Sequence, residues 1–214
     1  MNEADRDPRE ARRRAILDSA VRAFAQHGFF GSRIRDIATG AGVAEGTIYL
    51  YFGGKDDLLV TAFRERVNEF CAAVQSILAE ESSFPERLTR FIELQFEGIE
   101  EDPALATVLL VESRQSSSFY GGAVRDVLRS YAAAIDELLE SGRAEGAFRE
   151  DADLPLARRM LIGALEEIEL EWLLGDRSRP LGPTAPTMAA LFYRGLAPIT
   201  EVAPSGQGDG ATIR

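Results

Sequence analysis

Apolar residues recur at the three- to four-residue spacing of an α-helix along almost the whole chain. In residues 9–26, for example, Ile16, Ala20 and Phe24 lie on one face of a helix, and polar side chains occupy the other face. No stretch alternates apolar and polar residues as a half-buried β-strand does. The sequence therefore predicts an all-α protein.

Glycine, serine and proline residues interrupt this pattern and divide it into about nine helices. We expect the helices at 9–26, 32–40, 43–49, 56–80, 85–100, 103–115, 121–142, 154–175 and 185–199. Gly28, Gly142 and Gly175 are expected at helix ends, and Ser32 at the N-cap of the second helix. The first three helices form a small N-terminal unit, and the long fourth helix joins it to a larger bundle.

The net charge of −11 argues at first against a nucleic-acid partner, but the charge is unevenly distributed. Residues 1–60 are neutral overall, so the remainder carries the entire excess of acid. The arginines among the first 35 residues are Arg6, Arg9, Arg12, Arg13, Arg14, Arg22, Arg33 and Arg35. Because affinity for phosphates depends on where cations lie and not on the global sum, the N-terminal unit can still bind DNA.

Several classes of protein are excluded by composition. No apolar run is long enough to cross a bilayer, and the charged N-terminal segment lacks the apolar core of a secretory signal. A single cysteine, Cys71, rules out an intramolecular disulfide and suits a reducing compartment. We therefore expect a cytoplasmic protein without a membrane partner.

Enzymatic and metal sites have no support in the residues. The glutamates at 166, 167, 169 and 171 point in different directions around a helix, and the lone histidine, His27, lies far away in the sequence. No nucleophile elbow or glycine-rich phosphate loop occurs. We expect no catalytic residue, metal or cofactor; the glutamates either face solvent or the rim of a dimer, or they face a cationic ligand.

The segment "AGVAEGTIYLYFGGKDDLL", residues 41–59, carries the main functional signal. Its β-branched and aromatic centre favours a strand by propensity alone, yet helical patterns precede and follow it. Gly42 permits a tight turn between two short helices, which indicates a helix-turn-helix. Val43, Ile48 and Phe52 would then pack inward. Plain core packing of the aromatic residues is the alternative.

The outward residues of this segment are the predicted DNA contacts. Ala44, Glu45, Thr47 and Tyr49 would face outward on a recognition helix. Around its end, Tyr49, Tyr51 and Lys55 could reach phosphates, because tyrosine hydroxyls donate hydrogen bonds to phosphate oxygens and the rings can contact thymine methyl groups.

The longer segment "SRIRDIATGAGVAEGTIYLYFGGKDDLL", residues 32–59, resembles the signature of TetR-family transcriptional regulators. One departure is Ala44, where the family often has a serine or threonine that can cap the recognition helix. With this resemblance, the predicted DNA-binding residues are Ser32, Arg33, Ala44, Glu45, Gly46, Thr47, Tyr49, Tyr51 and Lys55. The predicted domains are a DNA-binding unit at 1–55, a ligand-binding and dimerisation domain at 56–202 and a disordered tail at 203–214.

The resemblance implies a homodimer, usually a repressor, which binds a palindromic double-stranded DNA operator and holds a small-molecule inducer in its larger domain. Its last two long helices would pair with those of a second copy. Two expected helices, 154–175 and 185–199, carry more apolar residues than one buried face needs, which supports such a dimer independently.

Parts of the C-terminal region resemble the acyl-CoA-responsive TetR-type regulators of fatty-acid degradation. The similar stretches are "LATVLLVESRQSSSF", "IDELLESGRAEGAFRED" and "LPLARRMLIGALEEIELEWLLGD". The implied effector is a long-chain acyl-CoA. The predicted ligand-binding residues are Phe63, Phe91, Phe96, Leu109, Glu112, Arg114, Gln115, Ile168 and Trp172. The cations considered for the CoA phosphates are Arg87, Arg90, Arg114 and Arg125.

Two other functions stay open at this point. The protein could repress an efflux pump and respond to amphipathic cations that meet the glutamates. More distantly, it could be a helical lipid-binding protein. For each predicted apolar ligand residue, simple core packing is the competing interpretation.

Overall fold

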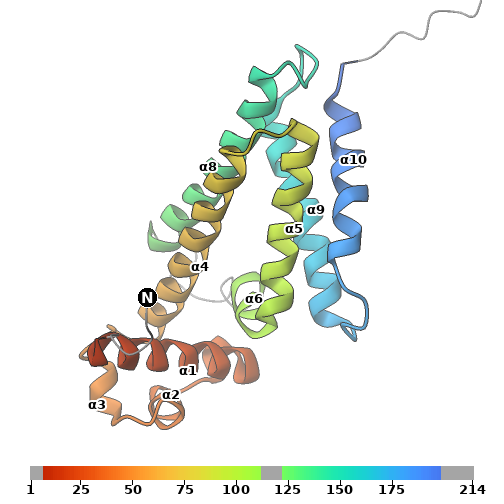
Figure 1. The fold of residues 1–214 in the computed structure, drawn as a ribbon. Helices are drawn as coiled ribbons and strands as arrows, with labels where there is room; N and C mark the ends of the chain where they lie inside the picture. The colour runs from red at the N-terminus through yellow and green to blue at the C-terminus, as the bar shows by residue number, and fades with distance from the viewer. Residues whose placement is uncertain (1–6, 112–121, 199–214) are drawn as a thin grey trace, which may run out of the picture.

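The computed structural model describes residues 7–111 and 122–198, and these residues are helical with short connections and no strand (Figure 1). The elements are α1 (Pro8–Gly31), α2 (Ile34–Gly40), α3 (Glu45–Ile48), α4 (Lys55–Leu78), α5 (Phe84–Glu101), α6 (Pro103–Leu110), α8 (Gly122–Ala144), α9 (Leu154–Leu174), the 3₁₀ turn η3 (Gly182–Thr184) and α10 (Ala185–Leu196). The all-α prediction is confirmed. None of these helices is long and apolar enough to cross a membrane.

The helices form two parts of unequal size. Helices α1, α2 and α3 make a compact layer at one end of the molecule, and α4 rises from it (Figure 1). Beyond that layer, α4 packs against α8, α8 against α9, and α5 against α10. A small helical unit thus stands at the end of an elongated bundle.

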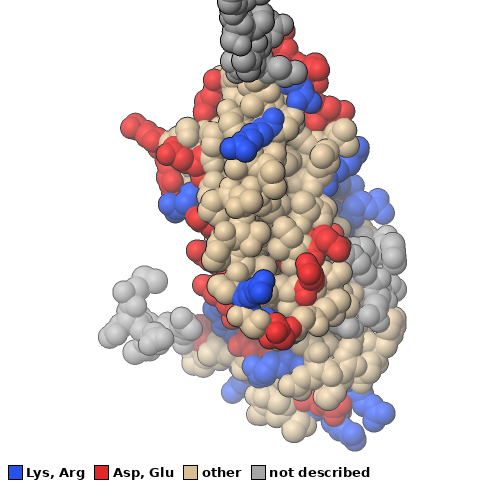
Figure 2. All heavy atoms as spheres, turned by 90° about the vertical axis from the view of Figure 1, so that its right-hand side faces the viewer, with Lys and Arg blue, Asp and Glu red and all other residues tan. Residues whose placement is uncertain are grey.

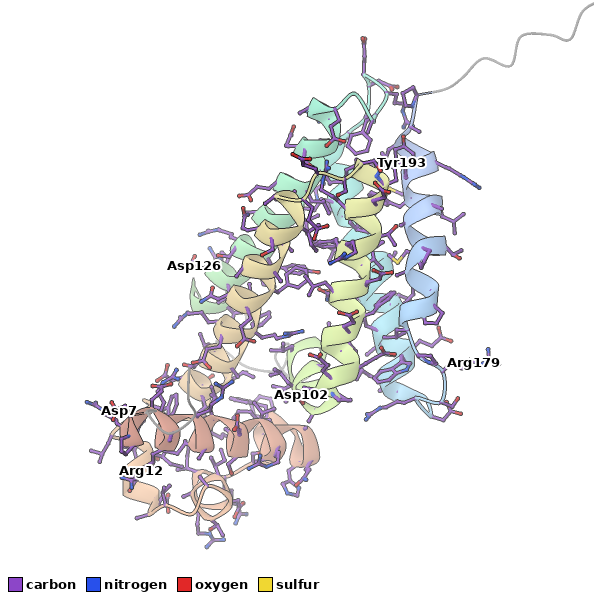
Figure 3. The ribbon with its side chains drawn as sticks, in the orientation of Figure 1. Asp7, Arg12, Asp102, Asp126, Arg179 and Tyr193 are labelled. Carbon is purple, nitrogen blue, oxygen red and sulfur yellow. The ribbon has the colours of Figure 1, made fainter. Side chains whose placement is uncertain are left out.

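The small unit has its own apolar core. Ile16 and Phe24 of α1, Ile37 of α2, Ile48 of α3 and the following Phe52 are buried together. At the start of α1, the Asp7 carboxylate accepts a hydrogen bond from the Arg9 backbone N–H, with an N···O distance of 3.0 Å (Figure 3). The spacing of apolar residues that predicted these helices also defines this core.

The positions of Gly28 and Ser32 relative to the helix ends differ from the prediction. Gly28 does leave the helical conformation, with φ of 71°, but the chain resumes one more turn up to Gly31. Ser32 is not the N-cap of α2: Arg33 occupies that position and makes no side-chain cap. The Ser32 hydroxyl instead donates to the carbonyls of Ala23 and Gly28, at 2.9 and 2.7 Å. Ser32 therefore closes the preceding helix, since its backbone N–H also donates to the Gly28 carbonyl at 3.2 Å.

Two elements connect the small unit with the bundle. The first turns of α4 contribute Leu58 and Leu59 to the N-terminal core, whereas Phe70 and Val74 further along belong to the core of the bundle. Helix α6 folds back on α1 and adds Val108 to the N-terminal core. The sequence indicated the first connection but not the second.

Gly142 corrects another expectation. It lies inside α8, which continues to Ala144, and the chain leaves the helix at Gly146, with φ of 71°. A side chain at Gly142 would overlap the edge-packed rings of Phe84 and Phe148. This glycine therefore serves close packing and not helix termination, whereas Gly175 does end α9 as predicted.

Candidate nucleic-acid interface and ligand cavity

Helices α2 and α3 are joined by a tight turn of the kind found in helix-turn-helix units. Gly42 adopts φ of 67°, and the Val43 N–H donates to the Ala38 carbonyl at 3.0 Å. After α3 the backbone continues in helical turns, since the N–H groups of Tyr51 and Phe52 both donate to the Ile48 carbonyl. The segment that favours a strand by propensity is therefore a short helix, because its apolar residues fit one face of a helix that packs on α1 and α2.

The aromatic residues of this segment divide by face. Phe52 is buried, as predicted, whereas Tyr49 is 57% exposed. Ala44, Glu45 and Gly46 are exposed at the start of α3. The predicted outward residues thus lie on the surface.

Leu50 is an outward residue that sequence reasoning missed, and it is 75% exposed. The signal for it was present: Ile48 and Phe52 are four residues apart and point inward, which leaves the position midway between them on the opposite side. An exposed leucine next to Tyr49 offers an apolar contact of the kind that thymine methyl groups accept.

Lys55 was predicted to reach phosphates, and its side chain is already engaged within the protein. Its ammonium group donates to the carbonyls of Phe29 and Ser32, at 2.7 and 2.8 Å. It also lies 4.8 Å from the centre of the Phe29 ring. Lys55 therefore ties α4 to the C-terminal end of α1, where carbonyls lack helical partners.

The remaining predicted contacts lie around the same end of the molecule. Arg33 is exposed at the start of α2, and Thr47 is half-buried. Tyr51 is half-buried against the N-terminal core, and the Arg9 guanidinium lies 5.9 Å from the centre of its ring. Ser32 is buried, and its hydroxyl, backbone N–H and carbonyl are all hydrogen-bonded inside the protein.

The bundle contains a partly open cavity of about 230 Å³ between α4, α5, α6, α8 and α9. Most of its wall is apolar or aromatic: Phe63, Val67, Phe70, Ile99, Leu109, Leu110, Leu128, Tyr131 and Ile162. The polar groups in the wall are Arg66, Gln95, Glu166 and Glu169. An apolar cavity with a few convergent polar groups is the usual form of a small-molecule site.

Only part of the predicted ligand set meets at this cavity. Phe63 and Leu109 line it. Phe91 and Phe96 are fully buried in the core of the bundle and do not line it. The predicted Glu112, Arg114 and Gln115 lie outside the residues that the structure describes.

Ile168 and Trp172 face a different place. They border an open hollow beside the loop that follows α9. The Trp172 indole N–H donates to the Arg179 carbonyl in this loop at 2.8 Å (Figure 3). Trp172 therefore fixes the loop and is not in the cavity wall. The sequence pattern does not reveal whether an aromatic residue such as Trp172 borders the cavity or the neighbouring hollow.

Arg87 also differs from the expectation of a phosphate-binding cation. It is buried, and its guanidinium contacts the Glu145 carboxylate, the Ser141 hydroxyl and the Ser82 carbonyl. Arg125 is exposed on α8, and Arg90 forms a surface ion pair with Glu80 at 3.5 Å.

Glu169 lies in the cavity wall but was not among the predicted ligand-binding residues; the sequence offered it only as one of four glutamates that could face a cationic ligand. It is completely buried, and neither carboxylate oxygen has a hydrogen-bond partner. Burial, together with the nearby charge of Glu166, raises its pKa to about 8, although the Gln95 side chain opposes this shift. The sequence held a signal, because Leu161, Leu165 and Leu173 share its buried helical stripe at intervals of four.

Arg66 connects the cavity with the small unit. Its side chain lies across Gly98 of α5, where a Cβ would overlap the guanidinium. The same side chain lines the cavity and also a crevice of about 290 Å³, which Arg14 and Arg22 of α1 border on the other side. Next to it, an ion pair between Arg13 and Glu65 links α1 to α4.

The outer face of α9 and α10 exposes large apolar side chains. Met160 is 61% exposed and Leu191 is 68% exposed, and Leu156 lies near them around one surface hollow. Figure 2 shows a largely uncharged surface on this side of the molecule, with a few charged groups within it and more along its margins. An exposed apolar patch of this kind is typical of surfaces that bind another protein.

Comparisons with known proteins identify the family. Residues 16–62 match the family described as bacterial regulatory proteins, tetR family, and residues 63–195 match the YsiA-like protein C-terminal region. The chain is 32% identical over 181 residues to the fatty acid metabolism regulator protein of Bacillus subtilis (strain 168), which covers 85% of this chain and 93% of that protein. This chain belongs to the TetR family of transcriptional regulators.

Solved structures give the same result. The fatty acid degradation regulator FadR from Bacillus halodurans superposes with a TM-score of 0.82 at 33% identity, covering 90% of this chain and 98% of the other. FadR from Bacillus subtilis in complex with stearoyl-CoA gives 0.80 at 32% identity, covering 86% and 98%. The predicted family, the fold with its N-terminal helix-turn-helix and the assignment as a regulator and not an enzyme are confirmed.

Proposed function

We propose that this chain is a homodimeric repressor that binds a palindromic operator and releases it when a long-chain acyl-CoA occupies the bundle, so that it controls genes of fatty-acid degradation in the cytoplasm. The main support for the proposal is the apolar cavity. Arg66 lies both in the wall of this cavity and in the crevice that borders α1, so it connects the cavity with the small unit. A solved relative in complex with stearoyl-CoA supports this choice of ligand class.

The DNA-binding surface has a defined shape in this proposal. Arg33 and Tyr49 contact phosphates, and the exposed residues at the start of α3 face the base edges together with Leu50. Tyr51, whose ring lies next to the Arg9 guanidinium, adds to the contact with the phosphates. Ser32 and Lys55 stabilise the unit from inside.

Two copies associate through the exposed apolar face of α9 and α10. Leu156, Met160 and Leu191 would be withdrawn from water by the same residues of a second copy, since a two-fold interface pairs one patch with itself. The dimer fixes the separation of the two helix-turn-helix units and so the spacing of the operator half-sites.

The size of the cavity suggests how the ligand acts. Small-molecule sites usually measure about 300–1,000 Å³, so a space of 230 Å³ must widen to admit a long acyl chain. Widening displaces α4 and α6, the two elements that also pack on α1. The ligand therefore favours a conformation in which the two DNA-binding units no longer match the operator, and release follows from its tighter binding to that state.

Fluorescence anisotropy of a labelled operator duplex, selected from random sequences, tests the proposal. Addition of stearoyl-CoA should release the protein, whereas CoA alone should not. Operator binding that stearoyl-CoA leaves unchanged would contradict the acyl-CoA effector. Failure to select any sequence would contradict a repressor and favour a helical lipid-binding protein.

One observation favours a second candidate, a repressor of an efflux pump that senses amphipathic cations. Glu166 lies in the cavity wall, and a carboxylate attracts cationic groups. The same anisotropy experiment distinguishes the two functions: release by a cationic dye, with no response to stearoyl-CoA, would establish the second.

A further inference from the structure

Glu169 is an unusual component of a wall that otherwise suits an alkyl chain. Buried polar groups in proteins are nearly always hydrogen-bonded, and an unpaired one is costly. Within residues 7–111 and 122–198, no donor has the geometry of a full hydrogen bond to either carboxylate oxygen of Glu169; the Gln95 amide lies near enough to oppose the rise of its pKa but does not overcome the effect of burial. A leucine at this position would complete the buried stripe of α9, so the carboxyl group has no evident role in packing.

The surroundings of Glu169 provide a small polar patch inside the cavity. Gln95 of α5 lies beside it, and Tyr131 of α8 faces the same space. Burial and the two glutamates at 166 and 169 raise the pKa of Tyr131, which keeps its hydroxyl protonated. Three neutral or neutralisable groups from three helices therefore converge on one part of the wall.

We propose, as a refinement that rests on the proposed function, that the preferred effector is an acyl-CoA whose chain carries a hydroxyl group, and that Glu169 binds this hydroxyl. A plain saturated chain fills the apolar part of the cavity but leaves the carboxyl group unpaired. A hydroxylated chain fills the same space and supplies the missing partner.

The charge state of Glu169 favours a hydroxyl over a cation. With a pKa of about 8, the carboxyl group is mainly protonated at neutral pH and can both donate and accept a hydrogen bond, as a hydroxyl also can. A cationic ligand would require ionisation of a group that burial keeps neutral. The Arg66 guanidinium in the same wall further opposes a second positive charge.

Isothermal titration calorimetry of the full chain compares stearoyl-CoA with two hydroxystearoyl-CoA isomers, one hydroxylated next to the thioester and one at mid-chain. We expect at least one isomer to bind about tenfold more tightly than stearoyl-CoA, which corresponds to one well-placed hydrogen bond. In Glu169→Leu this preference should disappear, while Glu169→Gln should retain part of it. Glu97→Leu, the same change at an exposed position of α5, should leave the preference unchanged.

The outcomes separate this inference from the proposed function. If stearoyl-CoA binds and releases DNA but neither isomer binds more tightly, the hydroxyl preference is wrong and the repressor function stands. A preference that persists in Glu169→Leu, with its thermal melting confirming a folded protein, also contradicts the role of Glu169. If no acyl-CoA binds, the proposed effector itself fails, and tight binding of a cationic amphiphile instead would overturn both.

Discussion

The two ends of α4 lie in regions that differ in whether their buried polar groups are hydrogen-bonded. In the small unit, the Ser19 hydroxyl donates to the Ile37 carbonyl, and the polar groups of Ser32 and Lys55 are paired inside the protein. Among the described residues, every buried side-chain nitrogen or oxygen without a hydrogen-bond partner lies beyond α4, on Ser82, Arg87 or Glu169.

This difference suggests a division of labour. A unit whose buried groups are all satisfied has one stable arrangement and suits a fixed DNA-reading surface. A bundle with empty volume and an unpaired buried carboxyl group gains stability when a ligand supplies what is missing. The ligand-binding bundle and the DNA-binding unit thus differ in their internal packing. Arg66 lies where these two regions meet.

Truncation of Phe52 should give the largest effect and sharpen the contrast. Phe52→Ala removes a buried ring from the core of the small unit and should cost about 3–5 kcal/mol of stability there, with loss of DNA binding. Phe91→Ala makes the same cavity in the bundle and should destabilise the protein while operator affinity persists in the folded fraction. Thermal unfolding measures the stability of each variant, and fluorescence anisotropy measures its operator affinity. Equal losses of DNA affinity in the two folded variants would contradict the proposed difference between the small unit and the bundle.

The pH dependence of stability should reveal the unpaired group. The pKa of Glu169 is raised from 4.5 to about 8 on folding, so between these values the folded state keeps a proton that the unfolded state has lost. The contribution of Glu169 to the free energy of unfolding is therefore complete below pH 4.5 and is lost as the pH rises through 8. Between these values, the free energy of unfolding should fall by about 1.4 kcal/mol per pH unit. Denaturant unfolding should show this slope in the wild type and not in Glu169→Gln; identical slopes would show that Glu169 is ionised in the folded protein.

Substitution of Lys55 tests whether its charge serves the interior or the DNA. Lys55→Met removes a donor that satisfies two carbonyls and should cost about 1–3 kcal/mol of stability. Operator affinity should fall, but its dependence on salt concentration should stay the same. Arg33→Met, at an exposed position, should instead reduce the salt slope by about 0.9. A reduced slope in Lys55→Met would restore this lysine to the phosphate contacts.

The smallest expected effect concerns the tyrosines. Tyr49→Phe keeps the ring and removes one hydroxyl from a residue that is 57% exposed, so operator binding should weaken by about 1 kcal/mol, or roughly fivefold. Tyr51→Phe, at a half-buried position, should weaken binding less. A larger loss in Tyr51→Phe would show that this tyrosine, and not Tyr49, makes the main contact.

Local patterns predicted the fold and the recognition segment well, because short-range spacing determines which residues of a helix face inward. The outward position of Tyr49 and the buried position of Phe52 follow from such spacing. Gly142 was misread because its close neighbour Phe84 comes from a distant part of the chain and packs there against Phe148.

The cavity could be predicted only in part. Phe63 lines it and Phe96 does not, although both are buried apolar residues, since the distinction depends on how five helices pack around an unfilled space. Lys55 shows the same limit for polar residues: its partners lie at the end of α1, more than twenty residues earlier in the chain.

Hydrogen exchange measured with and without stearoyl-CoA tests the central claim most directly. If the bundle senses the ligand and the small unit is a fixed reader, exchange should slow in α4, α5 and α9 around the cavity. The amides of α2 and α3 should keep their exchange rates. Protection confined to α2 and α3, or found nowhere in the chain, would contradict the account.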